Sequence, residues 1–337
     1  MAKLTTNYLG IKLKNPLIVG ACNLSLDIDQ ARRMEDAGAS AIVFKSLFEE
    51  QINLESLELE DDLTEYAERN AEMINLFPSL QHAGPEEHLD KLAKTKQALG
   101  IPVIGSLNCV HADTWVEYAV EMEKTGIDAL ELNMYAYPDN FEKSSAQIEQ
   151  EQLDILKSIK EKISIPISVK LSPHYAGILH LVKQMDEAGV NGFVLFNKLI
   201  QPDIDIKAVE HEIPWSLSNP SEHRISLRFI GLLYKNIKAD LCGNRGVYSG
   251  GEMAKLILAG ANAVQVVSAI YQNKEAHITT MLNELNAWME ENGFASLDDF
   301  RGKLSNAEVK DPFAYKRAQY VDIMMKPFEL LRKYPML

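Results

Sequence analysis

The chain repeats one short phrase four times, at residues 37–41, 125–129, 188–192 and 259–263, with glycine at the second position of each copy. Each copy closes an amphipathic helical stretch and precedes a short apolar run. Glycine suits the left-handed conformation that ends a helix, because it has no Cβ. Three of the apolar runs end on Lys or Asn and the fourth ends on Ser. Buried strands with polar ends are typical of a barrel with a site at its C-terminal mouth, so the phrase favours an enzyme over a binding module.

Short apolar runs followed by helical periodicity occur along most of the chain. The runs are residues 17–21, 41–45, 103–107, 129–133, 167–171, 193–197, 239–243 and 263–267. Such alternation is typical of parallel strands covered on both faces. Eight runs without the glycine fingerprint of a dinucleotide-binding turn favour a closed barrel over an open sheet. The sequence therefore predicts an α/β protein with a (β/α)8 TIM barrel.

No linker rich in Pro, Gly or Ser divides the chain, so residues 1–337 are predicted to form one domain, with the barrel at about 15–275. Residues 8–16 are predicted to form a small hairpin that closes the bottom of the barrel. Two insertions, 46–95 and 198–228, are expected at the mouth as lids or substrate walls. The remainder, from about 276 to 337, is predicted to be a helical extension that packs on the barrel or on a partner.

Composition narrows the class of protein. The net charge of −14 disfavours nonspecific nucleic-acid binding, which needs Lys and Arg to neutralise phosphates. Three cysteines, Cys22, Cys109 and Cys242, lack metal-site spacing, so no metal is predicted and a reducing compartment is indicated. The chain shows no signal-like N-terminus and no apolar run of membrane-spanning length. These features predict a cytoplasmic protein that does not bind membranes.

Polar residues at the ends of the predicted strands are candidates for chemistry. Lys45 and Lys170 would lie at the mouth, where a buried ammonium is costly unless it meets an anion or an electron-rich ligand. Alternatively, either lysine extends its charge to solvent. Asn133 and Asn197 can each offer a donor and an acceptor to a planar ligand, or simply cap a loop.

A phosphate site is predicted from the last third of the chain. Residues 241–251 follow the seventh run, are rich in glycine and lead into a helix, and Ser268 begins another helix after the eighth run. Backbone N–H groups at such helix starts suit a phosphate, and Arg245 could add charge-assisted hydrogen bonds. The glycines could also serve only as turns.

Together these segments resemble the FMN-dependent dihydroorotate dehydrogenases and their dihydropyrimidine dehydrogenase relatives, from residue 15 to about 304. The similar segments are 15–21, 44–46, 131–133, 169–173, 196–197, the two phosphate loops and 294–304. The resemblance is to the soluble class and implies an oxidoreductase of pyrimidine biosynthesis. Its reaction would pass a hydride from dihydroorotate, or a similar dihydropyrimidine or cyclic amide, to flavin N5 while a base removes the neighbouring proton.

The resemblance also implies the residues that hold the ligands. FMN would lie across the mouth and contact Ala21, Lys45, Ser46, Asn133, Lys170, Phe196, Arg245, Gly246, Val267 and Ser268. Lys170 would face the flavin pyrimidine edge, where positive charge stabilises reduced flavin. The small-molecule substrate would contact Lys45, Asn75, Asn133 and Asn197. A homodimer is expected, and any iron–sulfur redox partner would be a separate subunit.

The chain departs from the family at the catalytic base. Soluble members carry Cys, and the membrane class Ser, three residues after the asparagine of strand four, where this chain has Ala136. The base is therefore unknown, and the candidates are Tyr135, Tyr137 and His174. An unperturbed phenol, with a pKa of about 10, is a weak base at neutral pH. The tyrosines could instead only stack on the ligand or the wall.

Two other interpretations stay open, and Ala136 motivates the first of them. The chain could be a divergent flavoprotein without dihydroorotate activity, either noncatalytic or specific for another substrate. It could also be a Schiff-base aldolase on the same barrel, with Lys170 or Lys45 as nucleophile. Arg245, which stands where the family often has Gly, could either strengthen the phosphate site or crowd it.

Overall fold

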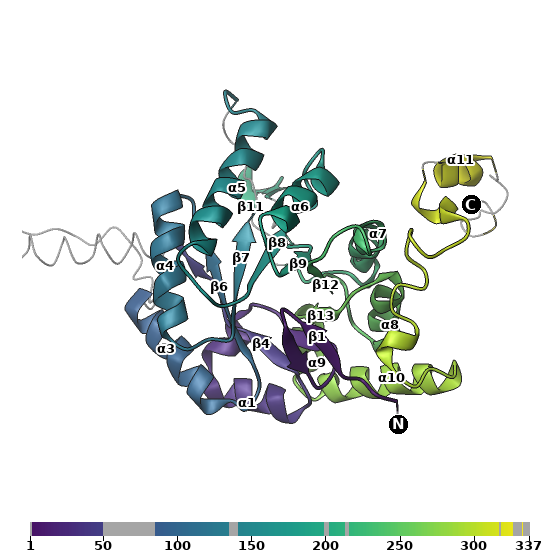
Figure 1. The fold of residues 1–337 in the computed structure, drawn as a ribbon, viewed down its shortest axis with the longest axis horizontal. Helices are drawn as coiled ribbons and strands as arrows, with labels where there is room; N and C mark the ends of the chain where they lie inside the picture. The colour runs from purple at the N-terminus through teal and green to yellow at the C-terminus, as the bar shows by residue number, and fades with distance from the viewer. Residues whose placement is uncertain are drawn as a thin grey trace, which may run out of the picture.

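Eight parallel strands close into a barrel, with helices around its outside (Figure 1). This computed structural model describes residues 2–49, 85–134, 141–198, 202–212, 216–316, 318–325 and 332. The barrel strands are β3 (Leu17–Val19), β4 (Ala41–Val43), β6 (Val103–Asn108), β7 (Ala129–Met134), β8 (Ile167–Leu171), β9 (Gly192–Leu195), β12 (Asp240–Gly243) and β13 (Ala263–Val266). A pairing between β4 and β6 completes the ring. All eight predicted runs are strands, so the predicted (β/α)8 barrel is confirmed.

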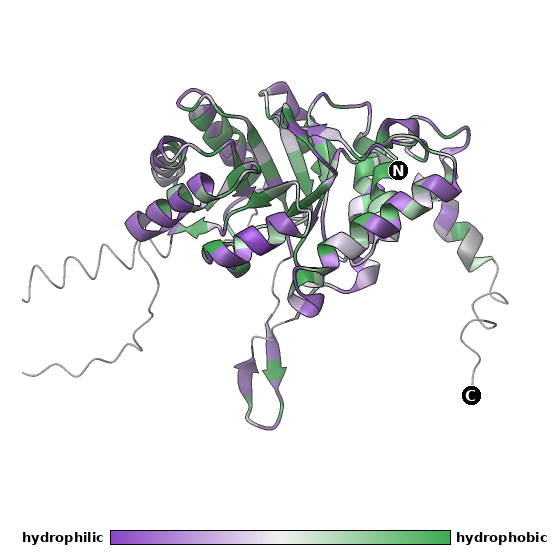
Figure 2. Ribbon diagram, turned by 90° about the horizontal axis from the view of Figure 1, so that it is seen from below, coloured by the Kyte–Doolittle hydropathy of each residue, from purple (hydrophilic) through white to green (hydrophobic). Residues whose placement is uncertain are grey.

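The helices bury one face and leave the other in solvent, as hydropathy colouring shows (Figure 2). They are α1 (Ile28–Asp36), α3 (Pro85–Ala98), α4 (Ala112–Lys124), α5 (Ser145–Lys160), α6 (Ile178–Glu187), α7 (His223–Leu233), α8 (Gly250–Ala259), α9 (Ser268–Asn273), α10 (His277–Glu291) and α11 (Ala318–Met324). Local side chains begin several of them. Ser144 and Gln147 form a capping box before α5, and the Asp27 carboxylate accepts two backbone N–H groups at α1.

The repeated phrase acts as a helix-to-strand connector. Its four glycines have positive φ, namely Gly38 (113°), Gly126 (83°), Gly189 (89°) and Gly260 (129°). Two residues later, the backbone N–H donates to the neighbouring strand. These bonds are Ser40 to Leu17 (2.9 Å), Asp128 to Val103 (3.0 Å), Asn191 to Ile167 (2.9 Å) and Asn262 to Leu241 (2.7 Å). Each copy therefore stops one helix and sets the start of the next strand against its neighbour.

The predicted hairpin closes one end of the barrel. Strands β1 (Thr6–Tyr8) and β2 (Ile11–Leu13) pair antiparallel around a turn in which Leu9 and Gly10 both have positive φ. Tyr8, Leu9 and Leu13 are buried against the lower barrel strands in a core cluster of their own. A Cβ on Gly192 would lie 2.6 Å from Leu9 Cδ2, so that glycine permits the close approach.

Of the two predicted insertions, 46–95 lies largely outside the described residues, whereas most of 198–228 is described. Residues 198–228 contain the exposed hairpin of β10 (Asp203–Asp205) and β11 (Glu210–Glu212), which stands clear of the barrel (Figure 2), and the short helix η2 (Pro220–Glu222). The extension is not one continuous helix, because α10 ends at Glu291 before Gly293, whose φ is 72°. Turns, η3 (Leu297–Asp299) and η4 (Pro312–Tyr315) follow before α11.

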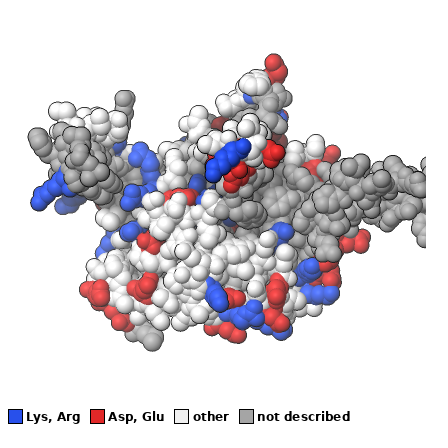
Figure 3. All heavy atoms as spheres, turned by 180° about the vertical axis from the view of Figure 1, so that it is seen from behind, with Lys and Arg blue, Asp and Glu red and all other residues white. Residues whose placement is uncertain are grey.

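The surface of the molecule carries charged side chains of both signs (Figure 3). On the face turned away in Figure 1, acidic and basic side chains are interspersed around the rim (Figure 3). This differs from the one-sided basic patch typical of nucleic-acid-binding faces. In the described ranges, no helix has both the length and the apolar character needed to cross a membrane.

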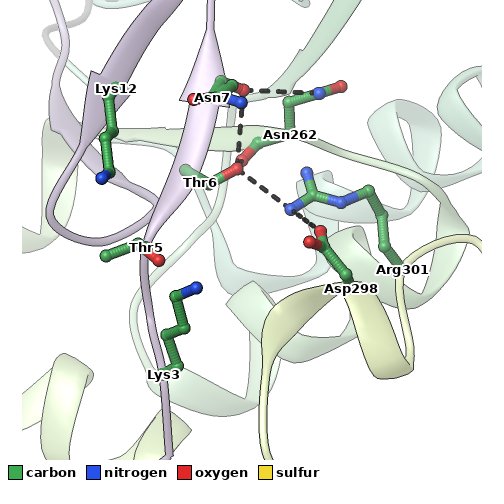
Figure 4. A pocket seen from close by; sticks show the side chains of 8 residues that line it. All are labelled: Lys3, Thr5, Thr6, Asn7, Lys12, Asn262, Asp298 and Arg301. Carbon is green, nitrogen blue, oxygen red and sulfur yellow. Dashed lines mark hydrogen bonds and ion pairs between the residues drawn. The ribbon is translucent and has the colours of Figure 1, made fainter.

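Arg301 ties the N-terminal strand, the barrel and the C-terminal extension together at the closed end (Figure 4). Its side chain is only 10% exposed and donates to Ala261 O (3.2 Å), Thr6 Oγ1 (3.0 Å) and Asp298 Oδ1 (3.1 Å). The Thr6 hydroxyl in turn donates to Asn262 O at 2.9 Å. One guanidinium therefore connects three parts of the chain that lie far apart in sequence.

We expect Arg301→Met to lower the free energy of unfolding by about 2–4 kcal/mol, because it leaves buried acceptors without their charged donor. Urea denaturation followed by circular dichroism measures the change. The matched control is Lys12→Met, in the same hollow, because Lys12 is exposed and forms no ion pair with a described residue. That variant should stay within about 0.5 kcal/mol of the parent protein. Equal losses in both variants would contradict the assigned role of Arg301.

Candidate active site

A cavity of about 270 Å³ lies at the C-terminal ends of β3, β8, β9, β12 and β13. Its lining includes seven residues that the sequence analysis assigned to ligand binding. They are Ala21, Lys170, Asn197, Arg245, Gly246, Val267 and Ser268. These residues come from five separate segments, and the parallel barrel brings them together because all its strands end at the same rim.

The loop after β12 contributes a constrained glycine and a paired arginine. Arg245 and Gly246 both have positive φ (71° and 59°), and a Cβ on Gly246 would lie 2.3 Å from Asn219 O. The Arg245 guanidinium donates to Glu222 Oε2 through Nε (3.1 Å) and Nη2 (2.7 Å). Burial opposes ionisation of Glu222, but the Asn219 N–H and Arg245 outweigh it and hold the pKa of this carboxyl below its usual range. The ion pair fixes the arginine at the pocket edge.

The loop after β13 forms the adjoining wall. Val267 precedes α9, which begins at Ser268, and the Ser268 hydroxyl accepts the backbone N–H of Ser218 at 3.1 Å. Gly20 lies against this wall, since a Cβ there would come within 2.8 Å of Val267 Cγ2. The two predicted phosphate loops are therefore neighbours in one pocket, with small residues where the backbone approaches closely.

Lys170 reaches the pocket from inside the barrel. Its side chain is 6% exposed, and its ammonium donates to Gln265 Oε1 at 3.2 Å and lies 3.5 Å from Glu131 Oε1. Gln265 Nε2 donates to the other carboxylate oxygen of Glu131 at 2.5 Å. Of the two interpretations of this lysine, the structure therefore supports a buried ammonium at the mouth. The Lys170 side chain does not extend its charge to solvent.

The two asparagines at strand ends contact each other. Asn197 Nδ2 donates to Asn133 Oδ1 at 3.1 Å, and Asn133 is paired in register with Lys170 across β7 and β8. Asn197 lines the cavity, whereas Asn133 is not part of the lining and is 8% exposed. The two carboxamides therefore orient one another beside the pocket.

Lys45 and Ser46 lie on the segment after β4 and do not line the cavity. The Lys45 backbone N–H donates to Ser25 Oγ (2.8 Å), and the Ser46 hydroxyl bonds Ser106 Oγ of β6 (2.7 Å). Burial, with a further contribution from the nearby Lys91 charge, lowers the pKa of Lys45. The segment is fixed to the barrel, and the Lys45 ammonium loses its proton at a lower pH than the ammonium of an exposed lysine does.

The remaining predicted positions are placed differently. The Phe196 ring is fully buried and packs edge-on against Phe229, with ring centroids 5.3 Å apart, so its side chain faces the core and not the cavity. His174 is exposed, and its backbone N–H donates to Ser172 Oγ. It is not part of the cavity lining. Four predicted positions lie outside the described residues, namely Asn75, Tyr135, Ala136 and Tyr137.

Several polar groups at the site are not among the residues predicted to bind a ligand. Cys22, Lys198, Asn244, Gln265 and Tyr271 line the cavity. Glu131 and Gln265 carried a readable signal, because each is a polar residue inside an otherwise apolar strand. Cys22, Lys198 and Asn244 stand in loops and Tyr271 lies on α9, where polar or amphipathic residues are ordinary and mark no particular position.

A buried carboxylate fastens the segment that follows Lys45 and Ser46. β5 (Leu47–Phe48) pairs with the end of β6, and Glu49, next in the chain, accepts the backbone N–H groups of Val110 and His111. Glu49 Oε1 also lies 2.5 Å from His111 Nδ1. Burial works against ionisation of Glu49, but its hydrogen bonds outweigh it and lower its pKa, and the same carboxylate raises the pKa of His111.

We expect the His111 ring to titrate above its usual pKa of about 6.5 and to return toward it in Glu49→Gln. The stabilisation by His111 is complete below that usual pKa and is lost as pH rises through the raised value. The stabilisation by Glu49 is present above the usual carboxyl pKa and is lost as pH falls through its lowered value. Proton NMR titration of the imidazoles measures the effect, with the exposed His211 as internal control. An identical His111 titration in both proteins would contradict the pairing.

The fold and cavity define a class, the α/β-barrel enzymes with a cavity at the carboxyl ends of the strands and a buried cation beside it. Within that class, the chain belongs to the dihydroorotate dehydrogenase family, because the family model "Dihydroorotate dehydrogenase" matches residues 3–289. The resemblance seen in the sequence is confirmed. The chain is accordingly an oxidoreductase of this family, acting on CH–CH groups.

Curated relatives support the assignment over almost their full length. A protein of Thermoplasma acidophilum is 29% identical over 306 residues, covering 90% of this chain and 99% of the relative. Proteins of Thermoplasma volcanium (27% identical, 90% and 98% covered) and Methanocaldococcus jannaschii (25%, 86% and 94%) are also similar. Each is named "Dihydroorotate dehydrogenase B (NAD(+)), catalytic subunit".

Proposed function

We propose that the chain binds FMN at the barrel mouth and oxidises dihydroorotate or a similar cyclic amide. The observation that carries the proposal is the cavity itself, in which seven residues assigned to ligand binding from sequence alone line one continuous space. When bound, FMN would supply the hydride acceptor. The protein's part is placement, charge and exclusion of water.

The residues present fit such a group. Gly20 and Gly246 leave no room for a Cβ beside Val267 and Asn219, so the backbone packs closely where the pocket wall is formed. Arg245 and Ser268 supply phosphate donors on one side of the cavity, and Lys170 supplies a buried positive charge. An anionic tail and an electron-rich ring edge are the two features that this set of donors recognises.

We assign roles to the residues beside the cavity as follows. Lys170 holds positive charge where reduction adds negative charge, which favours reduction. Asn133 and Asn197 bind the amide edge of a flat substrate, and Asn75, Lys45 and Ser46 complete its site. For the substrate proton, Tyr135, Tyr137 and His174 are the candidate acceptors, since Ala136 has no proton to exchange.

Anaerobic absorbance spectroscopy tests the proposal. Purified protein reconstituted with FMN should be yellow, and titration with dihydroorotate should bleach the flavin band, slowly if no strong base replaces the missing one. Protein that stays colourless after reconstitution would refute flavin binding. Borohydride trapping with aldehydes and ketones, expected to give no adduct on Lys170 or Lys45, tests the aldolase alternative.

A second candidate is a flavoprotein that does not use dihydroorotate, and the observation that favours it is Ala136 at the usual base position. It predicts FMN binding without bleaching by any dihydropyrimidine.

We further propose a cytoplasmic homodimer, with any iron–sulfur partner supplied by another chain. Light scattering coupled to gel filtration measures the oligomeric state, and a monomer at micromolar concentration would refute the dimer.

A further inference from the structure

Three polar side chains form a chain of contacts inside the barrel, and two of them, Lys170 and Gln265, line the cavity. Glu131 comes from β7, Lys170 from the adjacent β8, and Gln265 from β13 elsewhere on the ring. The Gln265 amide bridges the two charges, because its oxygen accepts from Lys170 and its nitrogen donates to Glu131. The Glu131–Lys170 pair, 3.5 Å apart, closes the triangle.

Glu131 is the least expected member of this triangle. Its side chain is 1% exposed, and among the described residues Lys170 is the sole cation within ion-pair distance. Its Oε1 has no hydrogen-bond partner among the described residues, although it faces the ammonium. An ionised carboxylate in a barrel core is costly, and an apolar residue would usually serve stability as well. Packing alone therefore does not account for a glutamate at this position.

We propose that Glu131 and Gln265 are positioning residues, which hold the Lys170 ammonium at the floor of the mouth cavity and so set its preference for reduced over oxidised flavin. The inference rests on the proposed binding of FMN. The carboxylate anchors the lysine from behind, and the amide fixes its direction. Neither residue needs to touch the flavin.

The proposal predicts that the effect of Glu131→Gln on the flavin midpoint potential depends on the presence of Lys170. A direct charge effect of Glu131 on the flavin would not depend on Lys170 in this way. Acting only through space, the negative charge of Glu131 disfavours reduced flavin, so Glu131→Gln would raise the flavin midpoint potential. Acting through Lys170, Glu131 keeps the favourable cation in place, so the same substitution lowers the potential. Removal of Lys170 should therefore abolish or reverse the effect of Glu131→Gln on the potential.

The test measures the midpoint potential of bound FMN in the parent protein, Glu131→Gln, Lys170→Met and the double variant. In the parent background, Glu131→Gln should reduce the preference for reduced flavin at least tenfold, about 30 mV for a two-electron couple. In the Lys170→Met background it should raise that preference or leave it unchanged. An increase or no change in the parent background overturns the proposal, as does an equal decrease in both backgrounds.

A flavin-free measurement separates failure of this inference from failure of the proposed function. Acetylation of the apoprotein by a water-soluble acetyl ester, followed by peptide mass spectrometry, reports how firmly Lys170 is held. Its rate should rise at least fivefold in Glu131→Gln, while the exposed Lys255 on α8 reacts equally in both proteins. An unchanged rate at Lys170 overturns the inference whether or not the parent protein binds FMN.

Gln265→Met provides a second variant, with similar length and no charge change, in case Glu131→Gln does not fold. It removes both amide contacts and keeps the Glu131–Lys170 pair. We expect the same direction with a smaller size, about twofold to fivefold in both measurements. A Gln265→Met protein that matches the parent in acetylation and potential shows that the amide does not position Lys170, which overturns its part of the proposal.

Discussion

Replacement of Ala136 by cysteine is expected to accelerate anaerobic bleaching of the bound flavin by dihydroorotate about 10²-fold to 10⁴-fold. This is the usual contribution of a positioned general base. The resemblance to the soluble class implies a cysteine base three residues after the asparagine of strand four, here Asn133. The proton next to the departing hydride would then have an acceptor that alanine cannot provide.

Stopped-flow absorbance under anaerobic conditions measures this rate across a range of dihydroorotate concentrations. Ala136→Val is the matched control, because valine is close to cysteine in size and accepts no proton. Ala136→Ser should give a smaller gain, as serine is the base of the membrane class but has a higher pKa. If cysteine and valine give the same rate, the base has been replaced elsewhere, or the substrate is not dihydroorotate.

Gly246→Ala is expected to weaken FMN binding about 100-fold or more. The left-handed backbone at this position costs an L-residue about 1–2 kcal/mol. In addition, the new Cβ would lie 2.3 Å from Asn219 O, a backbone atom that cannot move alone. The loop after β12, which carries Arg245 at the cavity edge, would therefore have to shift. A factor of 100 corresponds to about 2.8 kcal/mol of binding free energy.

Gly126→Ala isolates the two costs, because Gly126 also has positive φ (83°) but a Cβ there would meet nothing within 4 Å. This control should lose stability through backbone strain and keep the parent affinity for FMN. Fluorescence titration with FMN gives the affinities, and thermal unfolding gives the stabilities. Equal FMN affinities in the two variants would argue against a phosphate held at Gly246.

Much of the fold could be read from the sequence, because its signals are local. A glycine two residues into each repeated phrase ends a helix wherever the rest of the chain lies, and all four copies behave in this way. The alternation of apolar runs with helices then leaves few arrangements other than a barrel. The C-terminal extension was less predictable, since helical periodicity extends beyond Glu291 in the sequence but Gly293 interrupts it.

Less of the candidate site than of the fold could be predicted from the sequence. Lys170 and the loops at Gly246 and Ser268 could be assigned because strand ends and glycine-rich turns are visible in sequence. The side chain of Phe196, assigned with them, faces the core instead, because a residue's direction after a strand end depends on the path of the loop. The pairing of Arg245 with Glu222, 23 positions away, had no local signal at all.

The sequence by itself determined the element order, the glycine stops, the polar strand ends and the alanine at the usual base position. Only the tertiary structure decided which polar groups meet, such as Lys170 with Gln265 across 95 positions and Arg301 with Thr6 across 295. Helix caps and strand periodicity depend on neighbours within a few residues, so they are written in the local sequence. Ion pairs and pocket walls depend on closure of the barrel, which brings distant segments to one rim.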